Sequence, residues 1–146
     1  MKFSFILLLV LIGFASTSMI DAPMEKDKPL HIKKIEFGSI TINGETFEKD
    51  VVIDDRKVRQ RKKGPSKFKR GEYGHTPLTQ HEEIPWDCDV LVIGIGMSSR
   101  LPVTDNFKAE AAKRGVLLVL LETPDAVAYL NENHHDRMNA IIHITC

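Results

Sequence analysis

The strongest constraint on the fold is the order of apolar and amphipathic segments from residue 89 onward. Three largely apolar segments, Val90–Ile93, Val116–Leu121 and Ala140–Ile144, each have the length of a strand. Helix-like patterns separate them over residues 104–114 and from residue 123 onward. Strands joined by helices usually pair in parallel through right-handed crossovers, so this order predicts a largely parallel core sheet. Since Val116–Leu121 contains no polar residue, we expect it to be a central strand covered on both faces.

Residues that favour helix ends support these boundaries. Thr104-Asp105 can cap a helix that runs through Arg114, and Gly115 is well placed to end it. Thr123-Pro124 predicts the N-cap and the first helical position of a second helix. Residues 79–82 have the Thr-x-x-Glu spacing of a capping box, which predicts a helix of one or two turns there.

The N-terminal half reads as an antiparallel meander over residues 30–61. Asn43-Gly44 is a strong signal for a two-residue hairpin turn. We expect Thr46–Ile53 to form the return strand, and Asp54-Asp55 to turn the chain into a short strand over Lys57–Lys62.

The first residues resemble a targeting signal. Lys2 precedes an apolar run over residues 3–14, and small residues follow at positions 15–18. This pattern predicts a signal peptide over residues 1–18, a leader over 19–29 and a single domain over 30–146, exported from the cytoplasm. The alternative is a cytoplasmic protein that starts at Met19 or Met24. The apolar run is too short to span a bilayer comfortably, and we predict no transmembrane helix in the mature domain.

The chain has no net charge, but its charged residues are unevenly distributed along the sequence. The 146 residues have a net charge of zero, which disfavours a general attraction to nucleic acid or anionic membranes. Arg56–Arg70 nevertheless contains nine Lys or Arg and no acidic residue. This stretch, with a predicted loop over residues 64–74, could contact phosphates, or it could solvate an edge strand and block its pairing with other chains. We favour the second interpretation, because no nucleic-acid fold signature surrounds the stretch.

The turn Gly94-Ile95-Gly96-Met97-Ser98-Ser99 is the clearest candidate site. Small residues at the end of a buried strand permit close approach of a ligand, and free N–H groups with serine hydroxyls could hold an anion. The turn is not a dinucleotide fingerprint, because Ser99 stands where the third glycine would be and Pro102 delays the helix. A tight structural turn is an equal alternative.

Catalytic and metal sites have less support. Ser98 or Ser99 could act as a nucleophile with His143 as the base, but the sequence supplies no third, orienting group. Cys88 and Cys146 are the only cysteines, and a bridge between them is open if the protein is exported. No zinc spacing is present, and we predict neither a metal nor a cofactor.

Four separated segments together resemble a known family. They are Phe37-Gly38-Ser39-Ile40 with the Gly44 turn, Gly94–Val103, Thr123–Val127 with Tyr129 and Asn131, and the closing His143-Ile144-Thr145-Cys146. Residues 35–146 are similar to the family typified by animal adipogenesis-associated domain proteins. That family also includes archaeal and bacterial proteins of unknown function (the Mth type) and a mitochondrial complex I assembly factor.

This resemblance implies a single three-layer α/β domain. Its central sheet would be mixed, an N-terminal antiparallel hairpin would form a second layer, and helices would lie on one side. The resemblance implies no established enzymatic activity. Our leading hypothesis is a non-enzymatic protein-interaction module, for example an assembly or scaffold factor. Its contact residues would be Gly94, Gly96, Met97, Ser98, Ser99, Arg100 and His143. The alternative is a protein or enzyme that binds a small anion at Gly94–Ser99. Nucleic-acid binding through Arg56–Arg70 is a third and weaker hypothesis.

Overall fold

The computed structural model describes residues 29–133 and 136–146. The predicted signal peptide and all but the last residue of the predicted leader lie outside these residues. Within them, no helix is both long enough and apolar enough to cross a membrane. The elements in chain order are β1 (Ile32–Glu36), β2 (Ser39–Ile42), β3 (Glu45–Phe47), β4 (Val51–Asp54), β5 (Lys57–Gln60), the 3-10 helix η2 (Gly64–Lys69), α1 (Arg70–Tyr73), β6 (Val90–Ile95), α2 (Asp105–Lys113), β7 (Leu117–Leu121), α3 (Thr123–Glu132) and β8 (Met138–His143).

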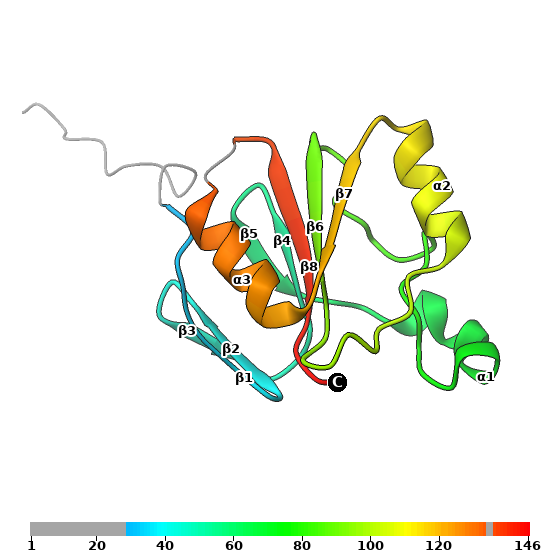
Figure 1. The fold of residues 1–146 in the computed structure, drawn as a ribbon, viewed down its shortest axis with the longest axis horizontal. Coiled ribbons are helices and arrows are strands. Elements are labelled where there is room, and N and C mark those ends of the chain that lie inside the picture. The colour runs from blue at the N-terminus through cyan, green and yellow to red at the C-terminus, as the bar shows by residue number, and fades with distance from the viewer. Residues whose placement is uncertain (1–28, 134–135) are drawn as a thin grey trace, which may run out of the picture.

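These strands form two sheets (Figure 1). The smaller sheet has the antiparallel order β1-β2-β3, and the larger has the order β5-β4-β8-β6-β7. In the larger sheet β8, β6 and β7 run parallel, whereas β4 is antiparallel to both of its neighbours, β5 and β8. The predicted α/β class is therefore confirmed, with a mixed central sheet and a separate antiparallel layer.

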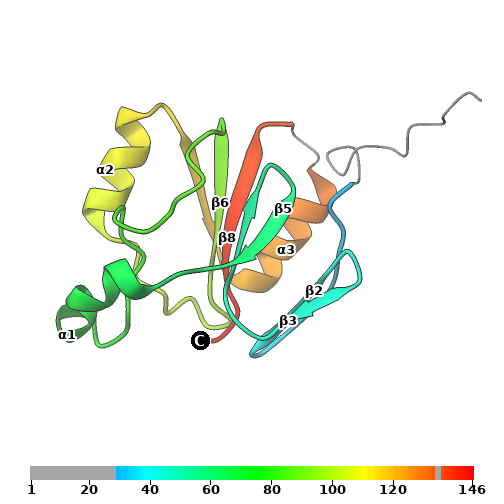
Figure 2. The ribbon, with the colours of Figure 1, turned by 180° about the vertical axis from the view of Figure 1, so that it is seen from behind.

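The central sheet is covered on both faces (Figures 1 and 2). Side chains alternate along its strands. Val92 and Ile142 pack toward α3 and the smaller sheet, while Leu91 and Ile141 pack toward α2. One detail thus differs from the expectation from the resemblance: α2 lies on the face opposite α3, so the helices are not confined to one side. Phe107 of α2 is fully buried there.

The C-terminal strands differ from the expected order in one respect. We predicted a central position for Val116–Leu121, but β7 is an edge strand and Leu117 is 62% exposed. The central position belongs to β8, which pairs with both β4 and β6. An edge strand can be wholly apolar when α2 and α3 shield its two faces, so apolar composition alone did not reveal its place.

The caps of α2 are as predicted. Thr104 Oγ1 accepts a hydrogen bond from Phe107 N (3.2 Å), and Gly115 follows the helix with φ +70°. The residues predicted as a capping box, 79–82, do not begin a helix. Glu82 is instead buried against Arg61, an ion pair between distant residues that outweighs the local pattern.

The N-terminal hairpin at Asn43-Gly44 is confirmed, but the return strand is divided. The predicted strand Thr46–Ile53 is two strands: β3 stays in the smaller sheet, and β4 crosses to the central sheet and pairs with β8. Asp50 lies just before β4 and is buried. The predicted basic loop over residues 64–74 is helical, consisting of η2 and α1.

Candidate functional site

The carboxyl ends of the parallel strands β6 and β8 meet at one edge of the central sheet, where α/β proteins commonly bind ligands. The turn after β6 is held there by the first residue of α3. Thr123 Oγ1 accepts a hydrogen bond from Gly96 N (2.9 Å) and donates one to the carbonyl oxygen of His143 (2.6 Å). We predicted that Thr123 would be the N-cap of this helix, but Glu122 is the N-cap. The Thr123 hydroxyl instead joins the ends of β6 and β8.

Residues 145–146 occupy the position that we assigned to an anion. Met97 N donates to the Thr145 carbonyl (2.6 Å), and Arg100 N donates to the Cys146 carbonyl (2.9 Å). Gly96 has φ +110°, and a Cβ there would lie 2.3 Å from the carbonyl oxygen of Cys146. The turn is therefore closed by the protein itself, and these N–H groups are not free to hold a ligand.

His143, at the end of β8, links a buried carboxylate to a hydroxyl group. Its Nδ1 lies 2.8 Å from Asp50 Oδ2, and its Nε2 lies 3.2 Å from Thr145 Oγ1. The side chain of Asp50 is 2% exposed and that of His143 is 12% exposed. Asp50 immediately precedes β4 and His143 ends β8, and because these two strands are antiparallel neighbours in the central sheet, residues so distant in sequence are in contact.

Asp50 is the centre of this group of polar residues. Its carboxylate also accepts from Arg61 Nη1 (3.1 Å), Lys63 Nζ (2.9 Å) and Ile144 N (3.1 Å). Burial acts to raise the pKa of Asp50, but the hydrogen bond and charge of His143, followed by those of Lys63, hold its pKa well below the usual value. The carboxylate is therefore ionised and accepts hydrogen bonds only.

Arg61 connects Asp50 to the segment that follows β5. It makes a two-point contact with Glu82, through Nε to Oε2 (2.8 Å) and Nη2 to Oε1 (2.7 Å). Burial alone would lower the pKa of Arg61, but Glu82 and Asp50 raise it above its usual value. Ser66 Oγ donates to Glu82 Oε1 (2.5 Å), which fixes η2 against the same network. One of the nine basic residues is thus a buried structural group.

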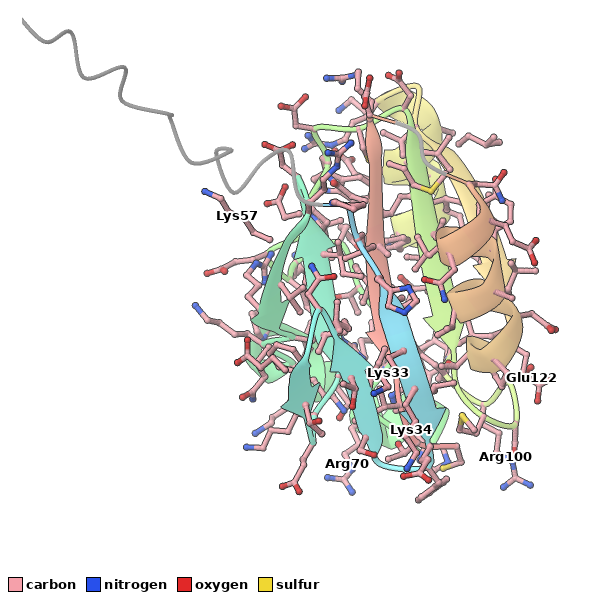
Figure 3. The ribbon with its side chains drawn as sticks, turned by 90° about the vertical axis from the view of Figure 1, so that its left-hand side faces the viewer. Lys33, Lys34, Lys57, Arg70, Arg100 and Glu122 are labelled. Atoms are coloured by element: carbon pink, nitrogen blue, oxygen red, sulfur yellow. The ribbon has the colours of Figure 1, made fainter. Side chains whose placement is uncertain are left out.

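A pocket of about 340 Å³ opens beside His143 and Thr145. We call it the cationic pocket, because among the described residues its lining includes four Lys or Arg and no Asp or Glu side chain. Figure 3 shows Arg70 and Arg100 projecting from the same end of the molecule. The lining residues are Lys63, Lys67, Arg70, His75, Thr76, Arg100, Leu101, His143, Thr145 and Cys146.

Of the residues predicted to contact a ligand or partner, only Arg100 and His143 line this pocket, and Cys146, predicted as a possible disulfide partner, lines it as well. Gly94 and Gly96 are buried, Met97 is half-buried, and Ser98 and Ser99 are exposed outside the pocket lining. Among the described residues, the hydroxyl hydrogen-bonded to His143 is that of Thr145 and not of either serine.

Sequence reasoning missed Asp50, Thr145 and three of the pocket cations, Lys63, Lys67 and Arg70, as site residues. The run of basic residues over 56–70 was a usable signal for the cations. Asp50 carried no such signal, because its partner His143 is 93 residues away.

The two cysteines, between which the sequence left a bridge open, are free thiols. Cys88 precedes the start of β6, whereas Cys146 contacts the turn after its end. A six-residue strand is roughly 20 Å long, far beyond the Cα separation of a disulfide. Burial raises the pKa of the Cys88 thiol to about 11.

Comparison with known proteins agrees with this architecture. The model of a family described as a protein of unknown function (DUF498/DUF598) matches residues 32–143. The fold is similar to that of a conserved hypothetical protein from Pyrococcus horikoshii OT3, with a TM-score of 0.68 and 27% identity over 79% of this chain and 98% of that one. Among curated proteins, none matches the chain in sequence.

Two further solved structures show the same fold. The protein MT938 has a TM-score of 0.62 and 27% identity, covering 80% of this chain and 99% of its own. A Bordetella pertussis protein described as an Mth938-like domain has a TM-score of 0.53 and 14% identity, covering 85% of this chain and 89% of its own. At that identity the likeness concerns the fold alone.

Proposed function

The chain belongs to the DUF498/DUF598 family of proteins of unknown function, and on this premise we propose that it binds a small anionic ligand in the cationic pocket. The observation that carries the proposal is the convergence of Lys63, Lys67, Arg70 and Arg100 on one concave surface. A volume of about 340 Å³ lies at the lower end of the range of small-molecule sites.

The positive charge of the pocket is only partly compensated. Lys63 forms an ion pair with Asp50. Within the part of the chain that the structure describes, Lys67, Arg70 and Arg100 form no ion pair. Three uncompensated cations that line one cavity attract an anion more strongly than isolated surface charges do, because the cavity walls exclude water from part of the field.

The rest of the basic stretch favours a small ligand over a nucleic acid. Outside the pocket its cations pair with acidic residues: Arg56 with Asp136, and both Arg59 and Lys62 with Glu83. A continuous basic stripe, such as a phosphate backbone requires, is therefore interrupted. Lys57 lies on the edge strand β5, where a charged side chain discourages pairing with other chains.

Calorimetric titration tests the proposal with three probes: inorganic phosphate, pyrophosphate and succinate. The test variant is Lys67→Gln/Arg100→Gln, and Lys57→Gln is the matched control, since Lys57 is exposed and projects away from the pocket (Figure 3). We expect the double variant to bind at least tenfold more weakly and the control to bind like the wild type. The proposal is refuted if none of the three probes binds to the wild type. It is also refuted if the double variant binds them as tightly as the wild type does.

A protein-interaction role is the second candidate, and one observation favours it. Phe37, in the β1–β2 turn, is 68% exposed. Gly38 N of the same turn donates to the Ile144 carbonyl (2.7 Å), next to the Thr145 carbonyl that accepts from Met97 N. An exposed aromatic ring, Met97 and Arg100 therefore border one short segment, and these residue types are enriched at interfaces. The resemblance to adipogenesis-associated and assembly-factor proteins points to the same role.

The two candidate functions depend on different residues at the same end of the molecule. Phe37→Ser combined with Met97→Ser removes the apolar contacts but leaves the cationic pocket intact. If an interaction is the function, this variant loses the partners that co-purify with the wild type and still binds succinate. Retention of every partner would count against the interaction role.

A further inference from the structure

The hydrogen bonds around His143 define which nitrogen carries the proton. Asp50 is an ionised carboxylate and can only accept hydrogen bonds, so Nδ1 of His143 must donate to Oδ2 across their 2.8 Å contact. In the neutral imidazole, Nε2 then carries the lone pair. The group 3.2 Å from Nε2 is the Thr145 hydroxyl, which in this form of the imidazole donates a hydrogen bond to Nε2. A hydroxyl, an imidazole acceptor and an orienting carboxylate are arranged in the order that activates a nucleophile.

We propose that Thr145 is a nucleophile that cleaves carboxylic esters bearing a second, anionic group, with His143 as its general base. This inference rests on the proposed function, because the cationic pocket would hold the anionic group of the substrate. Thr145 and His143 both line that pocket, so this pair borders the space in which the ligand would lie.

The reaction has two steps. In the first, Thr145 Oγ1 forms a bond to the ester carbonyl carbon while His143 Nε2 takes the hydroxyl proton. The bond from that carbon to the alcohol oxygen then breaks, and His143 returns the proton to the departing alcohol. In the second, His143 takes a proton from water and the hydroxide attacks the carbonyl carbon of the acyl-threonine. The bond from that carbon to Thr145 Oγ1 then breaks, and His143 returns the proton to Oγ1. The products are a carboxylic acid and an alcohol, and the enzyme is unchanged.

A carbonyl centre suits this geometry better than a phosphoryl centre. The tetrahedral intermediate lets one imidazole serve both the nucleophile and the leaving group on the same side. In-line phosphoryl displacement needs the leaving group opposite the nucleophile, where His143 cannot protonate it. Lys63 and Arg100 supply positive charge for the developing oxyanion, since the backbone N–H groups of Met97 and Arg100 are already engaged.

The test compares three chromogenic substrates: mono-p-nitrophenyl succinate, neutral p-nitrophenyl acetate and p-nitrophenyl phosphate. Release of p-nitrophenol and the mass of the acid-quenched protein are both measured. We expect the wild type to cleave the succinate ester fastest and to carry a succinyl group on Thr145. Turnover of the phosphate compound alone would overturn the choice of a carbonyl centre.

Thr145→Val removes the hydroxyl while keeping the shape, and Ser99→Ala is the control, since Ser99 is exposed and does not line the pocket. We expect Thr145→Val and His143→Gln to lower the rate at least 100-fold, the usual range for lost general-base catalysis, and Ser99→Ala to have no effect. Asp50 is a positioning residue, so Asp50→Asn should lower kcat with KM nearly unchanged.

Different results would refute the proposed binding function and the proposed nucleophile. Calorimetric titration of Thr145→Val with succinate should give the wild-type affinity. If the wild type binds succinate but neither turns over the ester nor becomes acylated at Thr145, the nucleophile is refuted and the binding function stands. Acylation of Lys63 or Lys67 in place of Thr145 would also refute the role of Thr145 as the nucleophile. If succinate, phosphate and pyrophosphate all fail to bind, the proposed function fails as well.

Discussion

Replacing Gly96 with alanine tests whether residues 145–146 close the turn after β6. Gly96 has φ +110°, and the added Cβ would lie 2.3 Å from the carbonyl oxygen and 2.6 Å from the carbonyl carbon of Cys146. These are backbone atoms, so the segment must move. Gly44→Ala is the matched control: Gly44 has φ +85°, and nothing lies within 4 Å of its added Cβ.

The structure separates the two contributions to the loss of stability. Both variants place alanine at positive φ, which costs about 1–2 kcal/mol. Only Gly96→Ala also displaces the carbonyl groups that accept from Met97 N and Arg100 N. Two lost hydrogen bonds add about 2 kcal/mol, so we expect a destabilisation of about 3–4 kcal/mol for Gly96→Ala and half of that or less for Gly44→Ala.

Urea unfolding measures this difference directly through the midpoint and slope of each transition. Thermal unfolding should show a decrease in Tm of roughly 10 °C for Gly96→Ala. Because the displaced segment forms part of the wall of the cationic pocket, Gly96→Ala should also distort the pocket and weaken succinate binding, while Gly44→Ala should not. Equal stabilities of the two variants, within about 0.5 kcal/mol, would refute the conclusion that the C-terminal residues close the turn.

Four further predictions follow from the same contacts. Arg61→Met leaves the buried carboxylates of Asp50 and Glu82 without their shared partner and should destabilise the protein by about 3–5 kcal/mol; Lys62→Met, which breaks an exposed pair with Glu83, should change urea stability by less than about 1 kcal/mol. Because folding lowers the pKa of Asp50, the contribution of this carboxylate to stability is complete above its ordinary pKa of 3.8 and is lost as the pH falls below that value. The urea midpoint should therefore decrease more steeply with falling pH for the wild type than for Asp50→Asn. Cys88, with its thiol pKa raised to about 11, should resist iodoacetamide at pH 8 in the folded protein and react only after unfolding, and equal labelling of Cys88 and Cys146 would contradict the burial of Cys88. If residues 1–18 are a signal peptide, mass spectrometry should find native protein that begins at Met19 in an exported fraction, whereas native protein confined to the cytoplasmic fraction would support a start at Met19 or Met24.

Predictions from local sequence patterns succeeded where neighbours along the chain determine the structure. The Thr104 cap, the Gly115 terminus and the Asn43-Gly44 hairpin each depend on a few consecutive residues. The division of Thr46–Ile53 between two sheets did not follow from its pattern. Nothing in its alternation of apolar residues shows that β4 pairs with β8, a strand formed by the last residues of the domain.

The same distinction applies to the candidate site. Arg100 and His143 were recognisable because each adjoins a distinctive segment, and the basic stretch was visible as charge. Its division into a buried Arg61, paired edge residues and pocket-lining cations depends on Glu82, Glu83 and Asp136, which are near only in space. Charge that looked like a solvated edge in part lines the cationic pocket.

The amino-acid order was sufficient to establish an α/β domain, most of its strands and helices, and its resemblance to a family, because apolar periodicity and capping are local properties. The cationic pocket and the hydrogen-bond chain from Asp50 through His143 to Thr145 arise only in the folded chain. Asp50 and His143 are separated by 93 residues and meet because β4 and β8 are neighbours in the central sheet. The turn after β6, which in sequence looked like the ligand site, is closed by the same residues that line the pocket beside it.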